Sequence, residues 1–259
     1  HAFKVNDSKP RDIHKASVRD RLVHHALYRA LYPYFDRQFI FDSYSCRLGK
    51  GTHRAINRFR GFGRIVSKNH TRTCWVLKCD IKKFFANIDH GMVARILAQH
   101  IANSNVLWLL REVIDSFPKG LPLGNLTSQL LVNIYMNEFD HFVKRKLKVQ
   151  YYIRYADDFV IFSESKAFLS AMKVHSIAFL KDRLKLEMHP RKVKIATLAS
   201  GIDFLGWVHF LHHRVLRTST KRRMFRKLNQ HHTDATVLSY IGLLKHGDAY
   251  AMSRKIGKR

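Results

Sequence analysis

The segment RYADDFVIF, residues 154–162, decides the fold of this chain. Two short runs rich in aromatic and β-branched residues, YYIRY (151–155) and FVIFS (159–163), stand on either side of Ala156, Asp157 and Asp158. Apolar runs separated by a few turn residues are typical of a β-hairpin. The sequence therefore predicts an antiparallel hairpin with two adjacent carboxylates at its turn.

A second acidic strand precedes this hairpin. The segment CWVLKCDI (74–81) predicts a buried strand with an acid, Asp80, near its end. Nucleotidyl transfer needs charge neutralised on the attacking and leaving oxygens, and two metal ions bridged by carboxylates from different strands provide this. Mg²⁺ keeps several waters and takes few protein carboxylates, so two or three acids suffice.

The two acidic segments make a joint prediction. Carboxylates in apolar surroundings are costly unless cations compensate them. Adjacent residues of a straight strand point to opposite faces, so the turn must bring Asp157 and Asp158 to one site. We therefore expect both to meet Asp80 on one side of a sheet, around divalent cations. The alternative is a solvated Asp-Asp turn beside an unrelated strand-end acid.

A basic helix and a glycine-containing loop are expected upstream of these strands. Apolar positions recur at helical spacing from Leu22 to Leu31, and Pro33 stands where this helix should stop. The loop SYSCRLGKGTHRA (43–55) follows. Its two glycines allow the backbone to lie close to a phosphate or an RNA strand.

The remainder of the chain alternates helices, strands and turns. Helices are expected over 91–114, 126–147 and 166–185, and in the basic C-terminal segment. The segments DFLGWVHFL (203–211) and HRVLRTS (213–219) predict a further pair of strands. This order is typical of an α+β fold, with a mainly antiparallel sheet backed by helices.

The charge of the chain indicates a polyanionic partner. Lys and Arg total 47 against 19 Asp and Glu, a formal net charge of +28. Such an excess opposes compaction unless a polyanion neutralises it, and nucleic acid is the natural candidate. No stretch approaches the roughly 18 consecutive apolar residues of a membrane span, and the basic residues are spread over the whole chain. A membrane partner is therefore not expected.

Cysteines and histidines predict no metal framework. Cys46, Cys74 and Cys79 form no disulfide pattern, which indicates a reducing, cytoplasmic setting. Cys74 and Cys79 flank the first predicted strand and are expected as small core residues. None of the 17 histidines combines with cysteines at zinc-finger spacing, so zinc is not expected.

Segments along nearly the whole chain resemble, in order, the motifs of reverse transcriptases. YADD within RYADDFVIF resembles the catalytic hairpin of that family. The other motifs are SKPRDIH (8–14) and SVRDRLVHHAL (17–27), similar to the fingers; SYSCRLGKGTHRA, similar to the template-contacting loop; LKCDIKKFFANIDH (77–90), similar to the first catalytic strand; GLPLGNLTSQ (120–129), similar to the segment that holds template and nucleotide; DFLG (203–206), similar to the primer-grip turn; and SYIGLLKHGDAY (239–250), similar to a thumb helix.

The resemblance implies a right-hand polymerase with fingers, a ferredoxin-like antiparallel palm and a short helical thumb. It places the fingers at 1–75, the palm at 76–213 with a helical fingers insertion at about 91–120, and the thumb at 214–259. The implied activity is RNA-directed DNA synthesis from a template RNA, a DNA or RNA primer and deoxynucleoside triphosphates. Two Mg²⁺ ions are the implied cofactors, with Mn²⁺ as a candidate substitute.

The resemblance also implies roles at the metals and the triphosphate. Asp80 and Asp157 would bridge both ions, and Asp158 would assist or bind one. The backbone carbonyl of Ile81 would be a further ligand. Lys192 is similar to the lysine that protonates the leaving pyrophosphate.

Three other basic residues belong to the same assignment. Lys194, two residues after Lys192, is the open alternative to it, and either lysine could instead be a solvated strand end. Lys9 and Arg11 would grip the triphosphate as a point charge and a planar fork. A solvated basic loop is the other interpretation of that pair.

The nucleotide pocket draws on two segments. Phe85 would lie under the sugar and exclude a 2′-hydroxyl by filling its space. Phe84 and Phe85 are both also plausible core residues, and only one can face the site. Leu123, Gly124 and Gln129 would line the pocket, the first and last as candidate determinants of fidelity. Gln129 could instead cap or pair within its helix.

Nucleic-acid contacts are implied for the loop, the primer grip and the thumb. Arg47, Lys50 and His53 would touch template phosphates or sugars, contacts that position without reading sequence. A basic thumb helix would follow the minor groove of the duplex. The remaining residues implied in contacts are Phe204, Leu205, Gly206, Lys221, Arg222, Arg223, Arg226 and Lys227.

Within the family, LGNLTSQ (123–129) resembles reverse transcriptases of diversity-generating retroelements, which copy a template RNA with errors at adenine. Retroviral and group II intron enzymes usually have Gln-Gly ahead of this segment and Ser-Pro at its end. Ala156 departs from the subgroup, which more often has Met there. Defence-associated and retron enzymes are the close alternative. A small basic multimeric accessory protein, in the cytoplasm of a bacterial or phage-infected cell, follows from analogy alone.

Two further functions fit the same composition. A non-catalytic RNA-binding protein would keep the basic groove without the chemistry, although this chain retains all three acids. A polymerase that adds nucleotides without a template would share the motifs.

Overall fold

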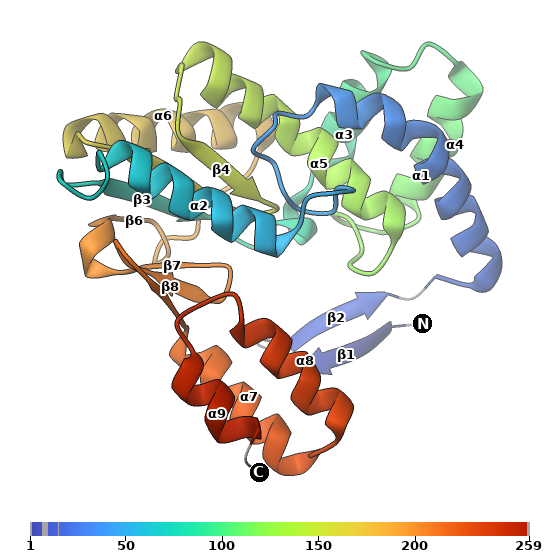
Figure 1. Cartoon of the computed structure of the whole chain (residues 1–259). Helices are drawn as coiled ribbons and strands as arrows, with labels where there is room; N and C mark the ends of the chain where they lie inside the picture. Colours follow the sequence, from blue (N-terminus) through green and yellow to red (C-terminus); the bar gives the residue numbers. More distant parts are fainter. Residues whose placement is uncertain (1, 7–9, 15, 258–259) are drawn as a thin grey trace.

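The computed structural model describes residues 2–6, 10–14 and 16–257. A four-stranded antiparallel sheet forms the centre of the fold, with helices packed around it (Figure 1). A three-stranded sheet and three C-terminal helices, α7 (Thr218–Gln230), α8 (Asp234–Leu244) and α9 (Tyr250–Gly257), lie below the central sheet in the view of Figure 1. The expected α+β class is confirmed.

The central sheet has the strand order β4-β5-β3-β6. Its strands are β3 (Trp75–Asp80), β4 (Tyr152–Tyr155), β5 (Asp158–Ser163) and β6 (Lys194–Thr197). Neighbouring strands are antiparallel. Helices separate β3 from β4 and β5 from β6, which is the β-α-β-β-α-β order of a ferredoxin-like fold. The ferredoxin-like sheet expected from the sequence is therefore present.

Both faces of this sheet are covered. Successive residues of a strand point to opposite faces. Val76 packs on one face with the core residues of α2 (Thr52–Val66). Cys79 packs on the other face with core residues of four helices, α1 (Val18–Gln38), α3 (His90–Ala98), α5 (Leu126–His141) and α6 (Lys166–Leu184). Cys74 and Cys79 are buried and free, as expected of small core residues.

The first helix, α1 (Val18–Gln38), continues past Pro33, where the sequence predicts its end. That prediction was wrong because packing outweighs the roughly 3 kcal/mol that proline costs inside a helix. Tyr32 and Phe35, on either side of Pro33, are buried in the core. The expected apolar face was only partly right, since Leu27 is buried but Leu22 is 68% exposed.

The helical segment predicted at 91–114 consists of two helices, α3 (His90–Ala98) and α4 (Ser104–Asp115). The side chain of Asn103 accepts hydrogen bonds from two backbone N–H groups in the first turn of α4. Such a cap starts a new helix by satisfying its first free donors. The break therefore depends on one capping side chain rather than on the apolar pattern.

The helices predicted at 126–147 and 166–185 are confirmed as α5 (Leu126–His141) and α6 (Lys166–Leu184). A π-helical turn, Phe142–Lys146, follows α5. Most of α5 is buried, because α1, α3 and α6 all contact it.

The segment DFLGWVHFL is a hairpin rather than one strand. It forms β7 (Ile202–Phe204) and β8 (Trp207–His209), and β9 (Arg214–Leu216) pairs with β8. Leu205 and Gly206 form the turn, with φ angles of 50° and 86°. Two consecutive left-handed residues reverse the chain, which an alternating apolar pattern does not reveal.

The C-terminal segment is helical, as predicted. Its helices are α7 (Thr218–Gln230), α8 (Asp234–Leu244) and α9 (Tyr250–Gly257). They enclose a separate apolar core around Met224 and Trp207. The C-terminal helices are thus anchored on the three-stranded sheet.

The remaining elements are short. β1 (Ala2–Asn6) and β2 (Pro10–His14) form an antiparallel hairpin, and single 3-10 turns occur at Phe85–Asn87 and Leu198–Ser200. In the part of the chain that the structure describes, no helix has the length and apolar character needed to cross a membrane.

Candidate active site

Three carboxylates meet where β3 and β5 adjoin. Asp80 ends β3 and is the register partner of Asp158, the first residue of β5. Residues directly opposite each other on antiparallel strands project from the same face. The N–H of Ile81 donates to the carbonyl oxygen of Asp157 at 3.2 Å, so the turn lies against the end of β3. Asp80, Asp157 and Asp158 are called the acid site below.

The turn between β4 and β5 determines how its acids lie. Tyr155 and Asp158 are the last register pair, so only Ala156 and Asp157 connect the strands. Ala156 has a φ of 53°, a left-handed conformation that is uncommon outside glycine. Asp157 therefore stands outside the strand ladder and escapes its strict alternation of faces.

The acid site carries more negative charge than its surroundings compensate. Burial, together with the nearby charges of Asp158 and Asp80, raises the pKa of Asp157 to about 6. Burial also raises the pKa of Asp158, against the opposing charge of Lys78. The Oδ1 atom of Asp158 is buried and has no hydrogen-bond partner.

Two lysines face these acids. The Nζ atom of Lys192 lies 2.6 and 2.7 Å from the two carboxylate oxygens of Asp80. The Nζ atom of Lys78 lies 3.8 Å from Oδ1 of Asp158, close enough for charge attraction but too far for a hydrogen bond. Lys194 is exposed on β6, opposite Lys78. Of the two candidate lysines, the structure thus places Lys192 at the acid site.

Lys78 was not among the residues predicted from the sequence, although the sequence contains a signal for it. It stands two residues before Asp80 on the same strand, and a period of two puts both on one face. A lysine inside an otherwise apolar strand is unusual enough to be noted for that reason.

The acid site suits divalent metal ions. Mg²⁺ prefers oxygen ligands, which all three carboxylates and the backbone carbonyl of Ile81 offer. Asp158 has a buried oxygen without a hydrogen-bond partner, and the pKa of Asp157 is raised by burial and by the neighbouring carboxylates, so a bound cation would stabilise both groups. Within the described ranges, no three His, Cys, Asp or Glu side chains are already arranged as ligands around one point.

A cavity of about 770 Å³ opens beside the acid site. This volume is typical of small-molecule sites. Phe84 and Phe85 both border the cavity, but Phe84 is 3% exposed and belongs to the core, whereas Phe85 is half-buried. Phe85 is thus the ring available to a ligand. The wall residues that matter here are Asp80, Ile81, Asp157, Lys192, Phe85, Leu123 and His14.

The loop before α5 holds Phe85 in place. The N–H of Leu121 donates to the carbonyl oxygen of Phe85 at 2.8 Å. Gly120 has a φ of 66°, and a Cβ there would lie 2.3 Å from the same oxygen, so only glycine fits. The carbonyl oxygen of Gly120 lies 2.6 Å from Nε2 of His90. The backbone of Phe85 is therefore held by the segment at Gly120 and Leu121.

Four expected nucleotide contacts are placed less directly. Gly124 and Gln129 are not among the described residues that line the cavity. Gln129 lies in the first turn of α5, where its N–H donates to the carbonyl oxygen of Asn125. Arg11 belongs to β2, but its side chain lies outside the described part, as does the whole of Lys9.

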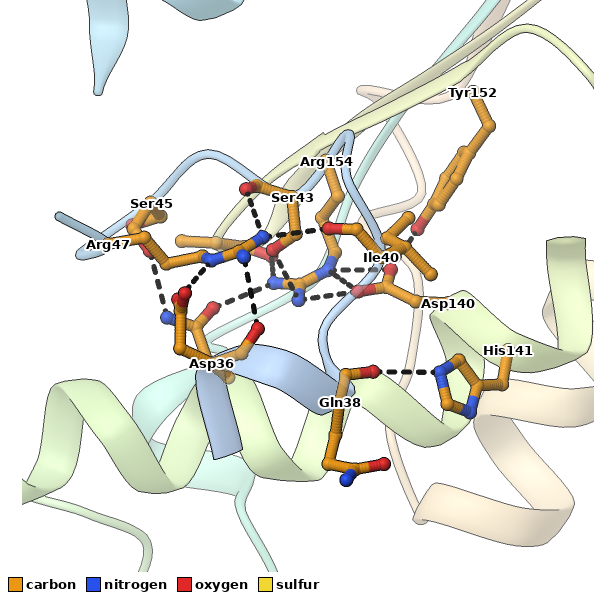
Figure 2. Close-up of polar contacts among 12 residues, drawn as sticks. Asp36, Gln38, Ile40, Ser43, Ser45, Arg47, Asp140, His141, Tyr152 and Arg154 are labelled. Carbon is orange, nitrogen blue, oxygen red and sulfur yellow. Dashed lines mark hydrogen bonds and ion pairs between the residues drawn. The ribbon is translucent and has the colours of Figure 1, made fainter. Parts of the chain in front are cut away.

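Arg47 is a structural residue, which corrects the expectation that it contacts the template. Its side chain is 6% exposed and ion-paired with Asp36 at 2.7 Å (Figure 2). Its remaining donors bind the carbonyl oxygens of Ile40, Ser43 and Asp36. A guanidinium that is 6% exposed and makes four internal hydrogen bonds fastens the loop to the end of α1 and is not presented to a phosphate.

The two other loop residues stay near the surface. The Nζ atom of half-buried Lys50 donates to the carbonyl oxygen of Phe41 at 2.8 Å and lies 3.5 Å from the centroid of that ring. His53 is exposed, and its ring stacks on His246 with centroids 3.6 Å apart. His53 thus links α2 to the segment between α8 and α9.

The residues expected in the primer grip and the thumb differ in how exposed their side chains are. Phe204 is buried in the core, so its side chain does not reach the surface, which corrects that part of the expectation. Leu205 and Gly206 form the turn itself. Arg222 and Arg226 are exposed on α7.

Comparisons with known proteins give a consistent result. A family model described as reverse transcriptase (RNA-dependent DNA polymerase) matches residues 4–209. The chain is 25% identical over 258 residues to Protein YkfC of Escherichia coli (strain K12), covering 83% of this chain and 66% of YkfC. It is 23% identical over 292 residues to the group II intron-encoded protein LtrA of Lactococcus lactis subsp. cremoris, covering 85% of this chain and 47% of LtrA.

Solved structures show the same fold. Telomerase from Candida tropicalis, in complex with a TWJ fragment of telomeric RNA, aligns with a TM-score of 0.62 over 80% of this chain and 42% of that chain. The identity is 11%, so the likeness concerns the fold alone. The chain spans only 66% of YkfC and 47% of LtrA.

Proposed function

We propose, from the premise that this chain belongs to the reverse transcriptase family, that it is an RNA-directed DNA polymerase. The observation that carries the proposal is the pairing of Asp80 with Asp158 across β3 and β5, with Asp157 on the adjoining turn. A net charge of +28 suits a protein that holds an RNA template and a primer.

The acid site is proposed to bind two Mg²⁺ ions, which Mn²⁺ could replace. Asp80 and Asp157 would hold both ions, with Asp158 and the carbonyl of Ile81 as further ligands. When bound, the ions neutralise charge on the attacking and leaving oxygens of the transfer.

Lys192 is proposed to hold the proton that the leaving pyrophosphate requires. Its ammonium group is 2.6 Å from Asp80, which keeps it at the reacting end of the cavity. A positioned acid of this kind typically contributes a factor of about 10² to 10⁴ to a rate.

Phe85 and Leu123 are proposed to shape the nucleotide pocket. The half-buried ring of Phe85 lines the cavity beside Asp80 and would fill the space of a 2′-hydroxyl. Lys9 and Arg11 would bind the triphosphate. Gly124 and Gln129 would influence the pocket indirectly, by supporting the residues that line it.

The division of labour among the parts of the chain follows the same proposal. Fingers at 1–75, palm at 76–213 and thumb at 214–259 would surround the duplex. Lys50 and His53 would contact the template, and Leu205 and Gly206 the primer. The exposed basic side chains of α7, Arg222 and Arg226 among them, would follow the minor groove.

A diversity-generating retroelement is the proposed source of the template. The segment LGNLTSQ (123–129) supports it, and a small basic multimeric accessory protein would follow by analogy. The intron-encoded name of LtrA supports a second candidate, a reverse transcriptase of the group II intron type. Templates rich in adenine separate the two. Excess misincorporation that falls when Leu123 or Gln129 is changed supports the first, and an unchanged error spectrum the second.

The activity itself is tested by primer extension on a defined RNA with Mg²⁺. Wild type should make DNA complementary to the template, and Asp157→Ala should lose the activity, while the exposed Asp182→Asn keeps it. Equal extension by wild type and Asp157→Ala, or none by either, would favour an RNA-binding protein. A product unrelated to the template would indicate template-independent synthesis.

A further inference from the structure

A fully buried ion pair lies beneath the turn that carries Asp157. Arg154 and Asp140 are each 0% exposed, and their side chains meet at 2.7 Å between Nη2 and Oδ2 (Figure 2). Nε of Arg154 donates to Oδ1 of Asp140 at 2.8 Å, and the hydroxyl of Tyr152 donates to the same oxygen at 2.7 Å. Buried ion pairs rarely gain net stability over apolar residues of similar volume. The pair therefore calls for a reason other than stability.

The other donors of this guanidinium reach three separate segments. Nη1 donates to the carbonyl oxygen of Ala156 at 3.2 Å, in the turn beside Asp157. Nη2 donates to the hydroxyl of Ser43 at 3.0 Å, in the loop expected to contact the template. Nη1 also donates to Asn133 of α5 at 3.2 Å. Arg154, Asp140, Tyr152, Asn133 and Ser43 are called the Arg154 network below.

The backbone joins the same segments. The N–H of Tyr44 donates to the carbonyl oxygen of Arg154, and the N–H of Arg154 donates to that of Asp42, both at 3.0 Å. The amide of Asn133 donates to the carbonyl oxygen of Ser45 at 2.8 Å. The start of the loop at residues 43–55 is thus hydrogen-bonded to the edge strand β4, directly beside the turn that carries Asp157.

The turn needs such support. A non-glycine residue with positive φ, as at Ala156, costs on the order of 1 kcal/mol or more and persists only where its surroundings hold it. The hydrogen bond from Arg154 holds the carbonyl of that residue. Losing it would allow the peptide unit before Asp157 to rotate.

We propose that Arg154 is a positioning residue that fixes the Asp157 turn relative to the template loop through its contacts with Ala156 and Ser43. The inference rests on the proposed function for its effect on the rate of DNA synthesis, whereas its effect on cation binding depends only on the geometry of the turn. A shift of about 1 Å in such a constellation can cost about 100-fold in rate. Disruption of a partner behind a metal ligand typically weakens metal affinity by about tenfold or more.

The test is single-turnover primer extension by Arg154→Lys. Lysine keeps the charge but lacks the planar fork that reaches Asp140 and Ala156 together. The amplitude reports the fraction of folded enzyme, and the rate constant reports the geometry within it. We expect the rate constant to fall about 100-fold. A merely structural role would lower the amplitude and leave the rate constant unchanged, which would overturn the inference.

Two variants guard against misfolding as the cause. Arg154→Met combined with Asp140→Leu replaces the pair by apolar residues, which buried pairs often tolerate, and should fold while remaining slow. Tyr152→Phe removes one hydrogen bond from the same network without touching the turn, and should keep the wild-type rate constant. A folded double variant with the wild-type rate constant would also overturn the inference.

Mn²⁺ binding followed by electron paramagnetic resonance separates this inference from the proposed function. We expect Arg154→Lys to bind Mn²⁺ about tenfold more weakly than wild type or Tyr152→Phe. If wild type extends no primer but this difference is seen, the polymerase proposal fails and the positioning role stands. If wild type extends primers and Arg154→Lys matches it in rate constant and Mn²⁺ affinity, the positioning role fails alone.

Discussion

The acid site and the Arg154 network lie on opposite faces of one sheet, and they differ in how completely their charges are balanced. Successive side chains of a strand point to opposite faces of the sheet. Arg154 therefore shares the α5 face with Tyr152, two residues before it on β4. Asp80 and Asp158 share the α2 face with Val76 of β3 and Val160 of β5. In the network, Asp140 accepts from Arg154 and Tyr152. At the acid site, a buried oxygen of Asp158 has no hydrogen-bond partner and only a distant ion pair with Lys78, at 3.8 Å. On the α5 face, folding alone pairs the buried charges. On the α2 face, the carboxylates would be fully compensated only by a bound cation.

The comparison predicts that removing Asp140 lowers the free energy of unfolding, whereas removing Asp158 does not. Asp140→Ala leaves Arg154 buried without its partner and should lower the free energy of unfolding by about 3–5 kcal/mol. Asp158→Ala removes a carboxylate whose pKa is raised by burial, and should leave that energy unchanged or higher. Urea unfolding of both variants without metal checks this. Equal losses would show that the two faces do not differ as described.

A pH dependence sharpens the same contrast. The folded-state pKa of Asp157 is about 6, above its ordinary value near 3.8. Its contribution to stability is therefore fully present below pH 4 and lost as pH rises through 6, by about 3 kcal/mol in total. Metal-free wild type, measured against Asp157→Asn by unfolding at pH 4 and pH 7, should lose stability by about this amount relative to the variant. A constant difference between the two proteins would contradict the raised pKa of Asp157.

Lys192 lies at the acid site, and its removal should change the rate of primer extension without weakening the binding of Mn²⁺. In Lys192→Met the single-turnover rate should fall about 100-fold, since a proton donor is lost. Mn²⁺ affinity should not weaken, because the ammonium group and a metal compete for Asp80. An exposed lysine of β6, changed in Lys194→Met, is the matched control. Weaker Mn²⁺ binding in Lys192→Met would mean that this lysine only positions Asp80.

The smallest expected effect concerns the wall of the cavity. Phe85→Val should raise incorporation of ribonucleotides relative to deoxyribonucleotides by about tenfold, because space opens beside the sugar. Competition between the two triphosphates on one RNA template measures it. Phe84→Leu, a change in the adjacent core ring, should alter stability but not this ratio. An unchanged ratio in Phe85→Val would show that the Phe85 side chain does not select between ribose and deoxyribose.

The acid site was largely predictable from sequence, because its signals are local. The hairpin at Ala156–Asp158 is flanked by apolar runs, and Asp80 ends another. The period of two along β3 would also have identified Lys78. Phe85 was chosen over Phe84 from the family resemblance alone; its greater exposure could not be derived from the local pattern, since the loop at Gly120 packs against it from a distant part of the chain.

The Arg154 network was not predictable, because its members come from distant segments. Ser43, Asn133 and Asp140 become neighbours of Arg154 only after α5 and the loop have packed on β4. Arg47 was misassigned for the same reason, since its partner Asp36 lies in a helix expected to end at Pro33. Long-range pairing decides whether an arginine is a ligand contact or part of the framework.

The central claim is that three carboxylates on two facing strands hold a pair of divalent ions. Mn²⁺ paramagnetic resonance on the protein with an RNA template, a DNA primer lacking its 3′-hydroxyl and the matching triphosphate tests it most directly. We predict two bound Mn²⁺ ions with the spectral coupling of a close pair, lost in Asp80→Asn and retained in Asp182→Asn. Uncoupled ions, or a spectrum that Asp80→Asn leaves unchanged, would contradict the account.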